Sequence, residues 1–141
     1  MTPSVYSDLI STLQVAISPV ILISGVGLLL LTMTNRLGRS IDRAREIKTG
    51  EKPSTNARVQ IEILFKRAHM LRWAILYATV SALCSGALII LLFLTLMTKR
   101  VLPWAVCLLF ISSIGALIVS LLFFLNDVNQ SLDALKKELA S

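Results

Sequence analysis

The stretch Leu9–Asn35, LISTLQVAISPVILISGVGLLLLTMTN, contains no Asp, Glu, Lys, Arg or His. Two further stretches, Trp73–Thr98 and Val101–Asn126, lack these residues as well. A helix that crosses a bilayer needs roughly 20 mostly apolar residues, because lipid offers the backbone no hydrogen-bond partner and a helix satisfies its own N–H and C=O groups. Each stretch exceeds that length. The sequence therefore predicts an all-α membrane protein with three transmembrane helices, at about residues 12–34, 74–98 and 102–125.

The distribution of basic residues predicts how the chain crosses the membrane. Short loops rich in Lys and Arg stay on the cytoplasmic side. Asp8 is the one charged residue before the first predicted span, and only Lys99 and Arg100 lie between the second and the third. The other twelve of the 14 basic residues follow the first or the third span: Arg36, Arg39, Arg43, Arg45, Lys48, Lys52, Arg58, Lys66, Arg67, Arg72, Lys136 and Lys137. We therefore expect a multi-pass protein with its N-terminus outside and its C-terminus in the cytoplasm.

The helical pattern continues beyond the first span. Apolar residues recur at i, i+4, i+7 and i+10 from Leu37 to Ile47, so the first helix is predicted to run on into the cytoplasm. Gly50 and Pro53 are typical of a helix end, and Ser54 or Thr55 can cap the next helix. Residues 35–73 are therefore predicted to form an antiparallel cytoplasmic hairpin that continues both spans. The tail, residues 126–141, is predicted to be an amphipathic cytoplasmic helix, and residues 1–141 a single membrane domain.

The predicted hairpin carries the positive charge of the chain. Residues 36–72 contain ten basic and four acidic residues, and the resulting charge of +6 equals the net charge of the whole chain. A solvated stalk that obeys the positive-inside rule explains this surplus, and contact with anionic lipid is a second explanation. We expect no nucleic-acid partner, because the cluster has no platform of interleaved aromatic residues for base stacking. Asp127, at the cytoplasmic end of the third span, is predicted to pair with Arg36, Arg39 or Arg43.

Small residues mark candidate packing faces within the spans. In lipid, helices associate through small side chains that permit close backbone approach. The second span has Ala74, Ala78, Ala82 and Gly86 at steps of four, and the third has Ser112, Ala116 and Ser120 at the same spacing. Packing within one chain and packing between chains both fit these stripes.

The first span has a different pattern. Ser18, Gly25 and Thr32 recur at steps of seven, and the line continues through Arg39 and Glu46. A heptad line is typical of a helix-contacting seam. If several copies surrounded an axis, the same line would give rings of Ser18, Gly25 and Thr32 in a pore, with arginines at a cytoplasmic mouth that would favour anions. Both interpretations remain open at this point.

Reactive chemistry is not indicated. His69 has no second His or Cys at the spacing of a metal site, no Ser has a credible His and carboxylate partner, and no phosphate-binding glycine loop is present. The spans also contain no charged residue of the kind that proton-coupled carriers use. We therefore expect no enzyme activity, no catalytic residue, no cofactor and no bound metal.

Nearly the whole chain resembles a known family, with weaker similarity at Lys66–Ala68 and Phe124–Val128. Ile17–Val20, Gly27–Leu31 and above all Asn35–Arg45 (NRLGRSIDRAR) are similar to family 2721 of the domains of unknown function, which comprises small bacterial membrane proteins. The resemblance implies three transmembrane helices, a bacterial cytoplasmic (inner) membrane and no established activity. It draws attention to a cytoplasmic charged cluster made of Asn35, Arg36, Arg39, Asp42 and Arg43, with Asp127 level with it.

Two functional hypotheses follow. The first is a homo-oligomeric pore or ion channel, with the line Ser18, Gly25 and Thr32 in the membrane and arginines at its inner mouth. The alternative is a non-conducting, membrane-anchored interaction or scaffold protein, whose basic stalk binds a cytoplasmic protein or anionic lipid. The first is preferred because topology alone accounts for the basic loop, whereas it does not account for a polar line inside the membrane.

Overall fold

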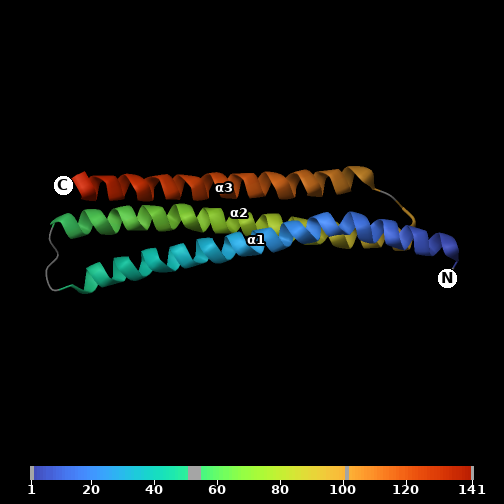
Figure 1. Cartoon of the computed structure of the whole chain (residues 1–141), viewed down its shortest axis with the longest axis horizontal. Helices are drawn as coiled ribbons and strands as arrows, with labels where there is room; N and C mark the ends of the chain where they lie inside the picture. Colours follow the sequence, from blue (N-terminus) through green and yellow to red (C-terminus); the bar gives the residue numbers. More distant parts are fainter. Residues whose placement is uncertain (1, 51–54, 101, 141) are drawn as a thin grey trace. The chain divides into compact units, whose positions relative to one another are not determined.

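A computed structural model describes residues 2–50, 55–100 and 102–140 and shows three long helices (Figure 1). They are α1 (Pro3–Thr49), α2 (Thr55–Thr98) and α3 (Pro103–Ala140). All three are long and apolar enough to cross a membrane. The predicted all-α fold with three apolar helices is therefore confirmed. The predicted roles of Pro53 and Ser54 fall outside the described residues.

The helix ends have local causes. Pro3 and Pro103 each occupy the first position of a helix, where the missing N–H costs no hydrogen bond and the fixed φ already suits the helix. Lys48 lies in the last turn of α1, next to carbonyl groups that favour a cation. Beyond α2, Lys99 has a φ of 53°, the left-handed conformation that often follows the last helical residue. As predicted, α1 continues past Asn35, without a break, to Thr49.

The chain packs as two units, each built from parts of all three helices. Unit 1 comprises residues 1–29 and 78–117, and unit 2 comprises residues 30–77 and 118–141. The buried residues of unit 1 include Ala16 and Val26 of α1, Ser81 and Ser85 of α2, and Ser113 of α3. Small side chains dominate this core, as expected where close backbone approach takes the place of hydrophobic exclusion of water.

Unit 2 has a core of different composition. Its buried residues are Met33 of α1, Leu71 and Ala74 of α2, and Ser120 and Asp127 of α3. The Ser120 hydroxyl donates a hydrogen bond of 2.6 Å to the Ala74 carbonyl, which ties α3 to the backbone of α2. A large apolar core residue and a buried carboxylate therefore lie in the same unit.

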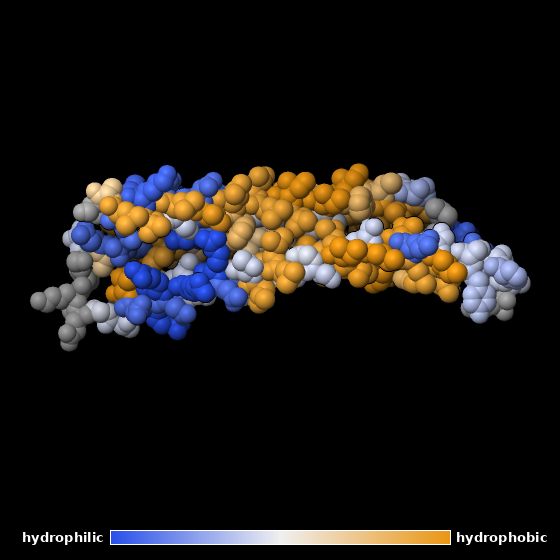
Figure 2. Space-filling view, in the orientation of Figure 1, coloured by the Kyte–Doolittle hydropathy of each residue, from blue (hydrophilic) through white to orange (hydrophobic). Residues whose placement is uncertain are grey.

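Most large apolar side chains face outward. Leu28, Leu83 and Ile90 are each at least 68% exposed, and hydrophobic residues cover much of the surface seen in Figure 2. In water such a surface would be unusual for a single chain, whereas lipid tails would cover it without cost. The exposed apolar surface agrees with a membrane protein.

Candidate functional site

Asp127 of α3 is the one buried charged residue among the described residues, and it is 1% exposed. Arg67 of α2 donates a hydrogen bond from Nε to Asp127 Oδ1 over 3.2 Å. Arg36 of α1 places its Nε 3.6 Å from Asp127 Oδ2. All of these residues belong to unit 2. One carboxylate therefore joins three helices through two guanidinium groups.

Ser131 completes this arrangement one turn farther along α3. Its hydroxyl donates to the Asp127 carbonyl over 2.9 Å and accepts hydrogen bonds from the guanidinium groups of both Arg36, over 3.4 Å, and Arg67. The Arg36 guanidinium also lies 5.4 Å from the centre of the Phe124 ring, a cation–π distance. We call Arg36, Arg67, Asp127 and Ser131 the Asp127 cluster. Each arginine is held by two or more groups of α3.

The Asp127 cluster holds more positive than negative charge. Burying a carboxylate costs several kcal/mol unless cations and hydrogen bonds compensate, and here two arginines compensate one carboxylate. Among the described residues, Asp127 Oδ2 has no hydrogen-bond partner, although Arg36 lies close by. The cluster thus keeps a surplus of one positive charge and uses only some of the N–H donors that two guanidinium groups supply.

A groove lies beside the Asp127 cluster, within unit 2. Its volume is about 630 Å³, in the size range of small-molecule pockets. Residues of all three helices line it, five of them basic: Arg36, Arg39, Arg43, Arg67 and Lys137. We call it the basic groove. Figure 2 shows hydrophilic residues gathered over this part of the chain.

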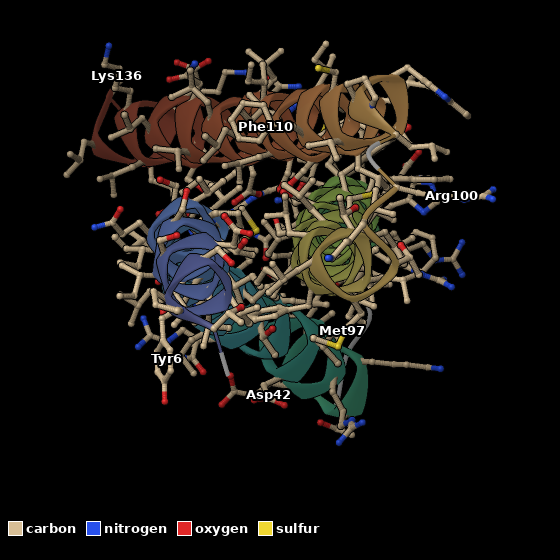
Figure 3. All side chains as sticks on the ribbon, turned by 90° about the vertical axis from the view of Figure 1, so that its right-hand side faces the viewer. Tyr6, Asp42, Met97, Arg100, Phe110 and Lys136 are labelled. Carbon is tan, nitrogen blue, oxygen red and sulfur yellow. The ribbon has the colours of Figure 1, made fainter. Side chains whose placement is uncertain are left out.

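The residues of the charged cluster predicted from the sequence do not all lie together in the structure. The expected ion pair of Asp127 is present with Arg36, whereas Arg39 and Arg43 are exposed and line the basic groove. Asn35 and Asp42 are exposed, and Asp42 lies on the outer side of α1, as Lys136 does on α3 (Figure 3).

Arg67 is the residue that sequence reasoning missed. It lies four residues before Leu71 and seven before Ala74, both of which are buried, so the three residues share one face of α2. The sequence does place this arginine on the same helical face as Leu71 and Ala74. Predicting its ion pair would also have required knowing that this face of α2 packs against α3.

Ser18, Gly25 and Thr32 are all exposed in the chain. Pro19, Val26 and Met33, each one position later, are buried and also recur at steps of seven, and Ala16 is the fourth buried residue of α1. Within one chain, the packing face of α1 is therefore displaced by one residue from the predicted line. The physical reason is that the bulkier Val26 and Met33 fill the space between helices, while the smaller residues are turned outward. Their role in a pore stays a prediction.

A group of hydroxyls lies inside unit 1. Ser113 donates to the Ser81 carbonyl over 2.9 Å, and its hydroxyl lies 2.6 Å from that of Ser85. Nearby, Cys84 Sγ lies 3.8 Å from the Ser112 hydroxyl, and both cysteines are free thiols. These contacts join α2 to α3 without any charged group, so they serve packing between helices that are apolar enough to span a membrane.

His69 of α2 has an aromatic partner one turn away. Trp73 donates from its indole N–H to His69 Nε2 over 3.1 Å, which places both residues on one face of α2. Among the described residues, no three His, Cys, Asp or Glu side chains lie close enough together to hold a metal ion.

Comparison with known proteins identifies a family. No curated protein and no solved structure is significantly similar to the chain. A family model described as "Protein of unknown function (DUF2721)" matches residues 16–137, which include most of the first apolar segment, all of the second and third, the Asp127 cluster and the basic groove except for its last residue, Glu138. This chain therefore belongs to the DUF2721 family.

Proposed function

We propose that the protein assembles from several copies in the membrane and that α1 lines the resulting pore. The observation that carries this proposal is the exposure of Ser18, Gly25 and Thr32 on a helix that is long and apolar enough to span a bilayer. Had the chain's own helices covered these residues, packing within one chain would have explained them. The chain's own helices do not cover them, and a second copy or water suits small and polar side chains better than lipid tails do.

The spacing of the exposed line supports contact between helices. Residues at steps of seven drift by only about 20° per step around a straight helix, so Ser18, Gly25 and Thr32 share one face of α1. Gln14, also exposed, precedes Ser18 by one turn on that face. Glycine permits close backbone approach, and hydroxyl or amide groups form hydrogen bonds between helices in lipid. The line is thus suited to self-association, and its polar groups are suited to a water-filled path.

The proposal includes an orientation and an environment. Twelve of the 14 basic residues would lie in the cytoplasm if the N-terminus were outside, as the positive-inside rule favours. Residues 35–73 would then form a cytoplasmic hairpin, and residues 126–140 a cytoplasmic helix. In an assembly around α1, the exposed Arg39 would lie near the inner mouth and favour anions. We propose the bacterial inner membrane as the location and no enzymatic role.

Two glycines of α1 offer a matched test. Gly25 and Gly27 are both exposed, and a Cβ built on either meets no atom within 4 Å, so neither substitution strains the single chain. They point about 200° apart around the helix. We expect Gly25→Leu to reduce the oligomeric mass measured by native mass spectrometry and to lower anion flux into liposomes at least about tenfold, because the leucine keeps the helices apart. Gly27→Leu serves as the control.

The outcomes decide the proposal. An unchanged mass and flux for Gly25→Leu, or the same loss in both variants, would contradict an assembly around this face. A wild-type protein that is monomeric at every concentration would contradict the pore altogether.

A second candidate function has its own supporting observation. The basic groove favours a non-conducting interaction or scaffold protein whose stalk binds a protein or an anionic lipid. Recovery of a discrete partner crosslinked through residues 36–72, together with a monomeric protein, would favour this alternative.

A further inference from the structure

The basic groove has the charge of an anion-binding site. Five basic residues and one carboxylate, Glu138, line it, and a second carboxylate, Asp127, pairs with two of the arginines. These seven side chains together carry a net charge of +3. Glu138 is itself engaged in an interaction. Because the attraction of several cations around one volume adds up, this arrangement strongly favours a multiply charged anion.

The wall of the basic groove is partly fixed before any ligand arrives. Asp127 and Ser131 hold the Nε and one terminal nitrogen of both Arg36 and Arg67. Each guanidinium has five N–H donors, so donors remain on both residues. Arginines held in this way lose little side-chain freedom on binding, and their planar fork matches phosphate oxygens. The Asp127 cluster thus provides rigid donors, whereas the exposed Arg39 and Arg43 provide adaptable ones.

The composition of the basic groove adds a second requirement. Apolar side chains from all three helices also line it, among them Ile47, Ile63, Leu64 and Leu135. Arg36, at one end, is the first charged residue after the uncharged stretch Leu9–Asn35, so that end adjoins the segment able to span the membrane. A site with basic donors, apolar walls and a position beside the bilayer fits a phosphate group that carries apolar substituents.

We propose that the basic groove binds a phosphate-bearing anion, with Arg36, Arg39, Arg43, Arg67 and Lys137 as its phosphate ligands. The shared chemistry is a phosphate group with neighbouring negative charge, and it can come from the head group of an anionic phospholipid or from a soluble polyphosphate. Basic pockets between membrane helices are known to hold phospholipid head groups. This site lies in unit 2 and needs no pore, so it stands whether or not the chain conducts ions.

The experiment measures binding by the intact protein in detergent, by native mass spectrometry. Cardiolipin and phosphatidylglycerol are titrated against phosphatidylcholine of the same acyl chains, and pyrophosphate is titrated in a separate arm. The test variant is Arg39→Gln/Arg43→Gln, which removes two groove cations that are exposed and so should not disturb folding. The control, Arg45→Gln/Arg58→Gln, removes the same charge from exposed residues that do not line the groove.

We expect anionic lipid or pyrophosphate to bind the wild-type protein with a defined stoichiometry of one per chain. The test variant should bind at least about tenfold more weakly, since each lost charge-assisted bond to phosphate is a strong one. The control should stay within about twofold. Binding of lipid alone would identify a head-group site, and binding of pyrophosphate in the absence of lipid would identify a soluble ligand.

Three results would overturn the site. Equal losses in the test and control variants would show attraction to total charge rather than to the groove. Equal binding of phosphatidylcholine and anionic lipid, with no binding of pyrophosphate, would remove the anion requirement. An absence of saturable binding of either lipid or pyrophosphate would show that the groove is not a binding site.

Discussion

At the scale of single residues, the charges of this protein divide into the Asp127 cluster, whose carboxylate is buried between two half-buried arginines, and charges that are exposed. The pairing of Asp127 with Arg36 was predictable, because both flank uncharged stretches and such ends lie at similar depth in a membrane. The participation of Arg67 and Ser131 was not, since it depends on the rotation of α2 and α3 about their axes. The positions of charges along the chain predict their depth, whereas the faces they occupy follow from packing.

Asp127→Asn tests the Asp127 cluster. The change leaves Arg36 and Arg67 without their carboxylate, and breaking a buried pair usually costs 3–5 kcal/mol. Because the two arginine side chains are 31% and 18% exposed, water compensates in part, so we expect the free energy of unfolding to fall by about 2–3 kcal/mol. SDS-induced unfolding in mixed micelles measures it. Asp133→Asn, on an exposed residue of the same helix, is the control and should change it by less than about 0.5 kcal/mol. Identical unfolding of Asp127→Asn and wild type would contradict a structural role for the cluster.

At the scale of the helix, the spacing of buried residues differs from the predicted stripes. The buried residues of α2 alternate between steps of three and four: Leu71, Ala74, Ala78, Ser81, Ser85 and Leu88. A stripe at steps of four turns by about 40° per step, so Ala74 and Ala78 are buried while Ala82 and Gly86 are only half-buried. On α3, Ala116 and Ser120 of the small-residue stripe are buried, but Ser113 takes the place of Ser112. The small residues in the sequence indicated an interface of closely packed helices. The 3.5-residue repeat of packed helices determines which residues are buried in it.

Overpacking distinguishes this seam from the lipid-facing side of α2. Ala78 is fully buried, so Ala78→Leu adds a branched side chain where neighbouring helices are in contact. We expect it to lower the free energy of unfolding by about 1–3 kcal/mol, measured by the same SDS titration. Ala87→Leu, on an exposed position nine residues later, should be tolerated or slightly stabilising. If Ala87→Leu lowered the free energy of unfolding as much as Ala78→Leu does, the assignment of the packing seam to the Ala78 face of α2 would be contradicted.

At the scale of the whole molecule, the sequence predicted the number and type of helices because the requirement for roughly 20 apolar residues per crossing is severe. It also predicted family membership, and the family match over residues 16–137 confirms this prediction. The basic groove was not predictable, because its lining residues come from three helices that are distant in the sequence. Grooves arise from tertiary packing, and the single-helix patterns that revealed the spans carry no information on them.

Topology is the whole-molecule property that charge alone predicts, and it can be tested directly. Translocating twelve basic residues is much less favourable than translocating Lys99 and Arg100, so the N-terminus should lie outside and the end of α1 inside. In a background with Cys84→Ala and Cys107→Ala, we expect a membrane-impermeant thiol reagent to label Ser4→Cys in intact cells. It should label Thr49→Cys only after lysis. Both positions are exposed, so accessibility within the protein does not bias the result. Labelling of Thr49→Cys but not Ser4→Cys in intact cells would reverse the topology and place the basic groove outside, where anionic lipid of the inner leaflet could not reach it.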